Sequence, residues 1–129
     1  MTESKQALVR SWLNKAARDL SSARILASAE EPLFDTAVYH CQQAAEKAVK
    51  AVLVFHNIYF EKTHDIDALL TLAATTDSRF HMYHETAELL PPYSTVFRYP
   101  GEGEEPGSEE YEEAVRKAQE LYAFVLSVL

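Results

Sequence analysis

Two long stretches of the chain contain no glycine or proline and repeat small or apolar residues at spacings of three and four. The first extends from about residue 4 to 29 and the second from about residue 34 to 57. This spacing places the apolar side chains on one face of an α-helix, whereas a half-buried strand would show strict alternation. The sequence therefore predicts two long amphipathic helices. The apolar face of the first consists of Trp12, Ala16, Leu20, Ala23 and Ala27.

The second stretch has the most continuous apolar face of the chain. Asp35 stands just before its periodic run, where the side chain of an N-cap would accept from free backbone N–H groups. Asn57 and Ile58 are expected to end the helix. Cys41 lies on the apolar face and is expected to be buried and unreactive. The face consists of Val38, Cys41, Ala45, Val49, Val52 and Phe55.

Three further helices are expected, over about residues 66–74, 78–90 and 109–128. Thr63 or Asp65 can cap the first of these, and Pro91 and Pro92 stop the second. The chain has three glycines and five prolines, too few for the frequent turns of an all-β fold. The sequence predicts an all-α, up-and-down antiparallel bundle of four to five helices. It would form one domain over residues 1–129, with an acidic loop at about 101–108.

The formal net charge of −8 comes mostly from one segment. Residues 102–113 hold seven acids and no base, and without them 13 acids face 12 bases. The first 24 residues instead carry five bases against two acids. The overall acidity therefore does not exclude a nucleotide or RNA partner, but such a partner must avoid the acidic loop.

Cysteine content and hydropathy indicate the compartment. A single cysteine cannot form an internal disulfide. The N-terminal residues show no signal-peptide character, and the longest apolar run is far shorter than a membrane span of about 20 residues. A cytoplasmic location without membrane association is expected.

The second long helix also carries a polar row at helical spacing, with Gln43, Glu46, Lys47 and Lys50 on one face. The simpler interpretation is a solvated face with a Glu46–Lys50 ion pair worth a few tenths of a kcal/mol. The alternative is a ligand-binding face.

His64 and Arg98 stand at two breaks between helices. His64 precedes a helix whose N-terminus attracts anions, so it can donate to a phosphate. The simpler interpretation is helix capping with a structural hydrogen bond. Arg98, followed by Tyr99 and Pro100, either holds a carboxylate or phosphate or clamps the loop onto the bundle.

Metal and cofactor motifs are weak or missing in the sequence. His81 and His84 lie three residues apart with Glu85 and Glu88 nearby, but no third histidine is close in sequence and no HExxH motif occurs. The glycine-rich phosphate-binding motifs are also absent from the sequence. We therefore expect neither a metal nor a cofactor.

Four motifs in this order resemble the HEPN domain, the helical family named for higher eukaryotes and prokaryotes nucleotide-binding. The resemblance covers about residues 8–128. The motifs are Trp12 with Ala16, Asp19, Leu20 and Ala23; the run from Gln42 to Ala51; Thr63-His64-Asp65-Ile66 with Leu69-Leu70; and Arg98-Tyr99-Pro100.

The resemblance implies a helical bundle that is often a homodimer. Many small prokaryotic members are encoded beside a minimal nucleotidyltransferase, in toxin–antitoxin-like pairs. It therefore implies a binding module with a nucleotidyltransferase partner and a possible nucleotide ligand. The candidate ligand-binding residues are Gln43, Lys47, Lys50, His64, Arg98 and Tyr99.

Many HEPN domains are instead metal-independent RNases that use an arginine followed a few residues later by a histidine. Arg98 falls near the expected arginine, but no histidine follows it in this sequence. The spacing does occur upstream, with four residues between Arg79 and His84. In this alternative His84 acts as the base and Arg79 stabilises the phosphorane, or Arg98 works with an unrecognised base. A third hypothesis is a structural helical protein whose acidic loop binds a basic partner.

Overall fold

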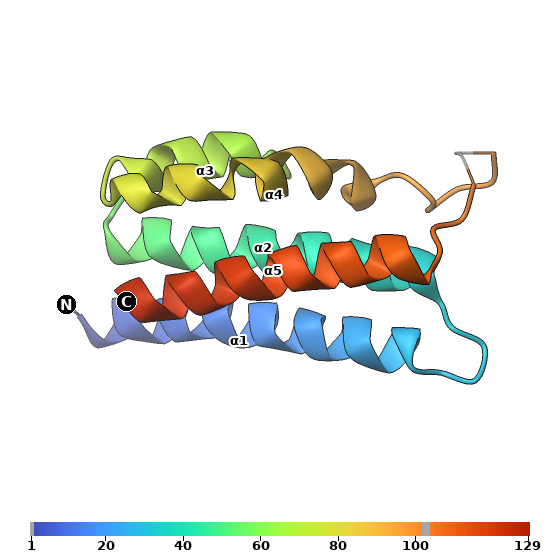
Figure 1. Ribbon diagram of the computed structural model, residues 1–129. Coiled ribbons are helices and arrows are strands. Elements are labelled where there is room, and N and C mark those ends of the chain that lie inside the picture. The colour runs from blue at the N-terminus through green and yellow to red at the C-terminus, as the bar shows by residue number, and fades with distance from the viewer. Residues whose placement is uncertain (1, 102–103) are drawn as a thin grey trace.

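The computed structural model describes residues 2–101 and 104–129, and all regular elements within these ranges are helical (Figure 1). The predicted all-α bundle is confirmed. Residues 102–103 of the predicted acidic loop lie outside the described residues. The elements are α1 (Glu3–Ala27), α2 (Phe34–Phe55), α3 (Ile66–Ala74), the 3₁₀ helix η1 (Ser78–Tyr83), α4 (His84–Leu89), the 3₁₀ helix η2 (Pro91–Ser94) and α5 (Ser108–Val128).

Helix α2 occupies the centre of the bundle. In Figure 1, α1 lies along the lower edge, α2 and α5 form the middle, and α3, η1 and α4 form the upper layer. Helix α1 packs antiparallel against α2, and α5 and α3 contact α2 from other sides. Cys41 of α2 is fully buried, and this burial raises the pKa of its thiol to about 12. The thiol therefore stays protonated and unreactive, as predicted.

Helix α2 begins at Phe34 as predicted, but its N-cap differs from the prediction. Its N-cap is Leu33, and the backbone N–H of Leu33 donates to the carbonyl of Leu26 at the end of α1, 3.0 Å away. The helix therefore begins at Phe34, one residue before Asp35. The Asp35 carboxylate lies in the first turn and accepts from the N–H of Thr36 at 2.8 Å. The proposal that Asp35 caps this helix is therefore wrong.

The end of α2 agrees with the prediction. Asn57 adopts a left-handed conformation with φ 58°, which asparagine tolerates better than most residues. The N–H of Ile58 donates to the carbonyl of Leu53 at 2.8 Å, and the N–H of Asn57 donates to that of Val54 at 3.1 Å. These two bonds are those of a Schellman motif, which satisfies the last carbonyls of a helix.

Of the two predicted capping residues of α3, Asp65 is the N-cap, and Thr63 forms the turn that precedes it. The Asp65 carboxylate accepts from the N–H of Ala68 at 3.1 Å, and the Thr63 hydroxyl oxygen accepts from the N–H of Asp65 at 3.0 Å. The connection from α2 to α3 therefore ends in a fixed turn, which holds His64 between the two capping residues.

The single helix predicted over residues 78–90 is wrong, because the structure divides it into η1 and α4. Side chains three residues apart lie above one another in a 3₁₀ helix, whereas an α-helix separates them around its axis. Phe80 and Tyr83 have this spacing, and both contact the ring of Phe124, with centroid distances of 4.9 and 5.1 Å. The 3₁₀ geometry thus places both aromatic side chains against α5.

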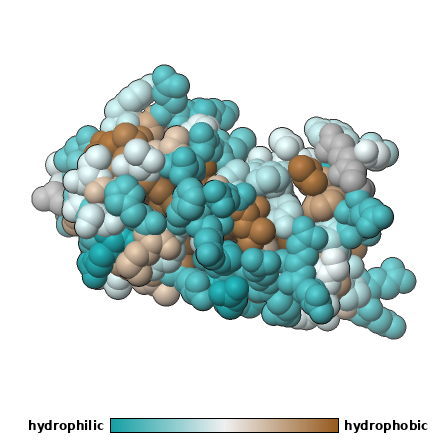
Figure 2. Space-filling view, turned by 45° about the horizontal axis from the view of Figure 1, so that its top comes forward, coloured by the Kyte–Doolittle hydropathy of each residue, from teal (hydrophilic) through white to brown (hydrophobic). Residues whose placement is uncertain are grey.

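The face of the molecule drawn in Figure 2 is largely hydrophilic. Figure 2 shows small, separated apolar patches within a polar surface, some of them in a hollow between the upper layer and the middle of the bundle. In the described part of the chain, none of the helices combines the length and the hydrophobicity that a membrane crossing requires.

Candidate functional site

The polar row of α2 is buried, and its interpretation as a solvated face is wrong. Gln42, Gln43, Glu46 and Lys50 are all buried, and only Lys47 is partly exposed. The spacing predicted one polar face correctly. It could not show that α1 and the segment before α3 cover this face.

One buried carboxylate organises most of these side chains into what we call the Glu46 cluster: Gln42, Gln43, Glu46, Lys50 and His64. Glu46 accepts from Lys50 Nζ at 3.0 Å, from His64 Nδ1 at 2.6 Å and from Gln42 Nε2 at 3.1 Å. Gln43 Nε2 donates to Gln42 Oε1 at 2.6 Å. No buried side-chain nitrogen or oxygen lacks a partner within the described ranges, so the cluster is fully satisfied.

Lys50 is enclosed by aromatic rings. Its ammonium lies 5.5 Å from the ring centroid of Trp12 and 5.8 Å from that of Phe60. These cation–π contacts and the Glu46 carboxylate compensate the charge of a buried lysine. Lys50 is thus held inside the protein, away from any ligand that approaches from solvent.

A second buried carboxylate forms the Asp19 cluster: Asp19, His40 and Lys47. Asp19 of α1 accepts from His40 Nδ1 at 2.8 Å and from Lys47 Nζ at 2.6 Å. Because an ionised carboxylate only accepts, Nδ1 of His40 carries the proton in this bond. The sequence reasoning assigned no role to Asp19 or His40. The available signal was an acid beside Ala16 and Leu20 on the apolar stripe of α1.

His40 also faces a cleft of about 280 Å³ between α2 and the segment after η2. Arg98 lies over the ring of Tyr39, with 4.9 Å between the guanidinium carbon and the ring centroid. Its Nη1 donates to the carbonyl of Ser94 at 3.4 Å. Arg98 therefore attaches its segment to α2 while its side chain stays at the edge of the cleft. We name this the Arg98 cleft, lined by Asp35, Thr36, Tyr39, His40, Phe97 and Arg98.

The backbone just before Arg98 is strained. Phe97 adopts φ 70°, a left-handed conformation that costs a non-glycine residue about 1–2 kcal/mol. Stacking of Phe97 on Tyr93, with ring centroids 6.1 Å apart, helps to hold this conformation. Burial and a hydrogen bond to Glu110 raise the pKa of Tyr93, so its hydroxyl stays protonated and anchors the segment to α5. Strain of this kind is found preferentially at functional sites.

The six predicted ligand-binding residues do not share one cleft. Gln43, Lys50 and His64 belong to the Glu46 cluster, where only His64 is well exposed, at 58% of its side chain. Lys47 belongs to the Asp19 cluster. Tyr99 is 63% exposed and lines a neighbouring hollow with Arg98. Only Arg98 lines the cleft that contains His40.

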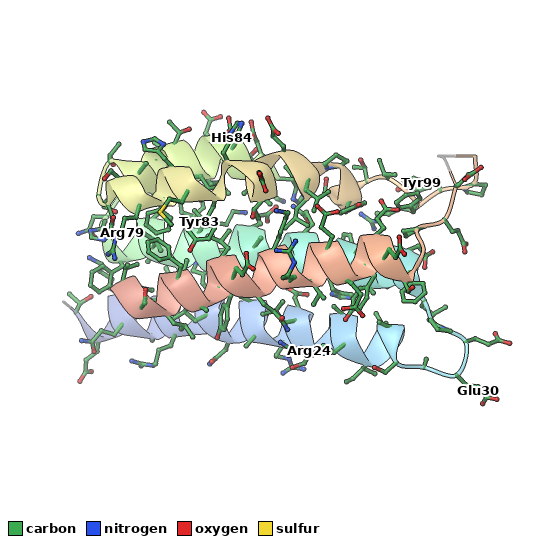
Figure 3. All side chains as sticks on the ribbon, in the orientation of Figure 1. Arg24, Glu30, Arg79, Tyr83, His84 and Tyr99 are labelled. Carbon is green, nitrogen blue, oxygen red and sulfur yellow. The ribbon has the colours of Figure 1, made fainter. Side chains whose placement is uncertain are left out.

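Arg79 and His84 each contact a local acid instead of one another. Arg79 pairs with Asp77, with 2.7 Å between Nη2 and Oδ2, and its hydrogen bonds lower the pKa of the Asp77 carboxyl. His84 lies 2.9 Å from the Glu88 carboxylate one turn further along. Figure 3 shows Arg79 at one end of the upper layer and His84 further along its outer edge.

The placement of histidines and acids bears on the weak metal motif of the sequence. In the described residues, no group of three or more histidine, cysteine, aspartate or glutamate side chains is placed to hold a metal ion. His81 and His84 both line a hollow with Asp67 between α3 and η1, without forming such a group.

The fold and the site together define an all-helical bundle in which the central helix and its neighbour α1 form two buried carboxylate clusters, one of them beside an arginine-lined cleft. A model of the HEPN domain family matches residues 9–128, and the chain belongs to this family.

Two solved structures resemble the whole chain. The protein TT1696 from Thermus thermophilus has 28% sequence identity and a TM-score of 0.75, covering 94% of this chain and 98% of that one. ST0689, described as an archaeal HEPN homologue, has 27% identity and a TM-score of 0.70, covering 92% of this chain and 95% of that one.

A sequence relative matches over a shorter stretch. The Methanocaldococcus jannaschii protein named "Putative toxin MJ1304" is 39% identical over 51 residues, which are 40% of this chain and 32% of that protein. The match therefore spans about a third of the relative's length.

Proposed function

We propose that this chain is a HEPN binding module that forms a homodimer and acts with a minimal nucleotidyltransferase in a toxin–antitoxin-like pair. In this proposal it binds the phosphate of a nucleotide in the Arg98 cleft. The observation that carries the ligand assignment is the meeting of Arg98 and His40 in one cleft beside a strained backbone. The relative named as a toxin supports the toxin–antitoxin context.

The groups around the cleft suit a phosphorylated ligand. A guanidinium binds phosphate oxygens through paired N–H donors, and the Thr36 hydroxyl adds a neutral donor. Tyr39 and Phe97 offer aromatic faces for a base. Asp35 at the rim supplies an acceptor for ribose hydroxyls or base N–H groups.

Asp19 fixes the orientation of His40. The bond to Asp19 uses Nδ1, so the other ring nitrogen, Nε2, remains for a ligand, and within the described residues it has no hydrogen-bond partner. Lys47 neutralises Asp19 from the opposite side, which keeps the cluster from repelling an anion. Lys47 thus acts behind the cleft, whereas Gln43, Lys50 and His64 maintain the fold.

Isothermal titration of the whole protein with AMP, ADP and ATP tests the ligand assignment. The expected result is saturable binding that Arg98→Gln weakens at least ~10-fold, since the arginine would lose a charge-assisted phosphate contact. Arg116→Gln is the matched control, because Arg116 is an exposed arginine of α5 paired with Glu120. No binding at millimolar nucleotide, or equal binding by the Arg98 variant, would contradict the assignment.

Association is tested separately by light scattering and by copurification with the protein of the neighbouring gene. A dimer that copurifies with a nucleotidyltransferase is expected. A monomer without such a partner would contradict this half of the proposal.

A second candidate function is RNA cleavage with Arg98 and His40. The observation in its favour is that His40 is held by a carboxylate in the cleft of Arg98. Nε2 would take the proton of a ribose 2′-OH, the 2′-oxygen would bond to phosphorus while the bond from phosphorus to the 5′-oxygen breaks, and the protonated His40 would return the proton to that leaving oxygen. Arg98 would stabilise the charged phosphorane.

Cleavage assays with single variants distinguish the two possible sites. Loss of cleavage in His40→Ala and Arg98→Ala, with activity retained in His84→Ala, supports the cleft. Loss in Arg79→Ala and His84→Ala alone would assign the reaction to that pair instead.

A further inference from the structure

The outer face of α1 carries a group of cations that no acid neutralises. Arg10, Lys15 and Arg18 are exposed there, together with Ser11 and Asn14. These side chains and Ala7 surround a shallow hollow of about 370 Å³. In the described ranges none of the three cations forms an ion pair. We call this the basic face of α1: Arg10, Ser11, Asn14, Lys15 and Arg18.

Helical spacing arranges these residues in two adjacent rows. Arg10, Asn14 and Arg18 follow one another at intervals of four, and Ser11 and Lys15 form the neighbouring row. Arg10 and Arg18 are eight residues apart, or about 12 Å along the helix axis. Figure 1 shows α1 along one edge of the bundle, with α2 and α5 on its other side.

Most other basic residues are used within the protein. Lys47, Lys50, Arg79, Arg116 and Lys117 each pair with an acid. The two acids of α1 do not serve its outer face, because Glu3 is its first residue and Asp19 is buried among its own partners.

The acidic segment of the chain lies far from this face. Residues 104–113 are at the opposite end of the bundle from the start of α1 (Figure 1). Arg10 and Arg18 are 17 and nine residues from the end of α1, about 25 and 13 Å along its axis, and both distances exceed the ~8 Å Debye length at physiological salt. The basic face is therefore locally positive despite the net charge of −8.

We propose that the basic face of α1 binds the sugar-phosphate backbone of a nucleic-acid duplex. Arginine, lysine, serine and asparagine are the side chains that contact phosphates in such complexes. The face has no aromatic side chain on which unpaired bases would stack, which favours a duplex over a single strand. Its five side chains include no aromatic or apolar anchor of a protein interface, and the exposed Leu8 lies only at its margin, which disfavours an acidic protein as the partner.

The composition of the basic face predicts how its binding depends on salt and on nucleotide sequence. Three cations that displace counterions give a log–log slope of affinity against salt of about −3. The binding is independent of sequence, because no side chain of the face is placed to read bases. It concerns a surface separate from the Arg98 cleft and does not depend on nucleotide binding there.

Fluorescence anisotropy with labelled duplexes of about 20 base pairs tests the proposal. The arms are DNA duplex, RNA duplex, the corresponding single strands and a poly-glutamate peptide, each titrated at several salt concentrations. The variant is Arg10→Gln, Lys15→Gln and Arg18→Gln together. The matched control removes three other solvent-accessible cations, by Lys5→Gln, Lys62→Gln and Arg116→Gln. Arg18→Glu serves as a single variant if the triple variant melts early by circular dichroism.

The expected result is salt-dependent binding of duplex that falls at least ~10-fold in the basic-face variant and persists in the control. The duplex that binds more tightly, DNA or RNA, is the one that we assign to the basic face. The proposal is overturned if duplex does not bind at low salt, if the two triple variants bind equally, or if single strands or poly-glutamate bind as tightly as duplex.

Discussion

The two buried carboxylates, Asp19 and Glu46, hold the same types of partner in different surroundings. Each accepts from one lysine and one histidine, Asp19 from Lys47 and His40, and Glu46 from Lys50 and His64. Glu46 also accepts from Gln42, and its lysine is enclosed between aromatic rings. The histidine of Asp19 instead lines the cleft that Arg98 borders.

The difference shows how one chemical arrangement serves two purposes. A buried ion pair such as Glu46–Lys50 fixes the position of the helices, and breaking it leaves an uncompensated charge. A pair whose histidine keeps one nitrogen toward a cleft can still respond to a ligand. We therefore assign Glu46 to the fold and Asp19 to the candidate site.

Glu46→Gln is expected to have the largest effect on stability. It leaves the Lys50 ammonium buried without its counter-charge, which costs about 3–5 kcal/mol. Urea unfolding measures the loss, and Glu88→Gln is the control because Glu88 is exposed. A loss below about 1 kcal/mol for Glu46→Gln would remove the distinction between the two carboxylates.

Removing both ions of the Glu46 cluster should recover much of that loss. Replacing a buried ion pair by uncharged side chains of similar volume is often neutral, so Glu46→Gln with Lys50→Met should be more stable than Glu46→Gln alone, by about 2 kcal/mol. The same urea experiment gives this double-mutant comparison. If the double variant is no more stable than the single one, the buried lysine is not the source of the cost.

Asp19→Asn should destabilise the protein less, by about 2 kcal/mol, because Lys47 and His40 both reach solvent when they lose the charged acceptor. It should also weaken nucleotide binding, since His40 loses its orientation. Unfolding and titration calorimetry on the same sample separate the two effects. A lower free energy of unfolding with unchanged nucleotide affinity would show that Asp19 serves only the fold.

Glu85 provides the exposed counterpart of these pairs and the smallest expected effect. Its carboxylate accepts from Lys117 at 2.8 Å, and this bond lowers the pKa of Glu85 although the side chain is 82% exposed. A lowered pKa contributes stability above the ordinary glutamate pKa, and this contribution is lost as the pH falls through the folded value. Glu85→Gln should therefore slightly reduce the stability difference between neutral and acidic pH. Urea midpoints from neutral to acidic pH, with Glu88→Gln as control, detect it. A larger stability difference between neutral and acidic pH in the Glu85 variant would contradict a stabilising role of this pair.

The helices were predictable because their signals are local. Apolar spacing, the two prolines at 91 and 92, and Asn57 mark elements that the structure confirms. The exceptions depend on tertiary contacts. The hydrogen bond of Leu33 to the end of α1 makes Leu33 and not Asp35 the N-cap of α2, and Phe80 and Tyr83 both contact Phe124 from a 3₁₀ turn.

The candidate site was only partly predictable for the same reason. Arg98 stood out because it interrupts the helical pattern beside a proline. The burial of Glu46 and Lys50 depends on which elements cover α2, and helical periodicity cannot show this. His40 acquires its role from Asp19, 21 residues earlier on another helix, and from a cleft formed by a segment almost 60 residues later.

Histidine NMR of the unmodified protein tests most directly whether the Asp19 cluster is the one that meets a ligand. The imidazole resonances of the five histidines are assigned by single substitutions and followed during titration with ADP. The account predicts a saturable shift of the His40 resonances, with those of His64 and His84 unchanged. A shift confined to His64, or no shift of His40 at saturating ADP, would contradict it.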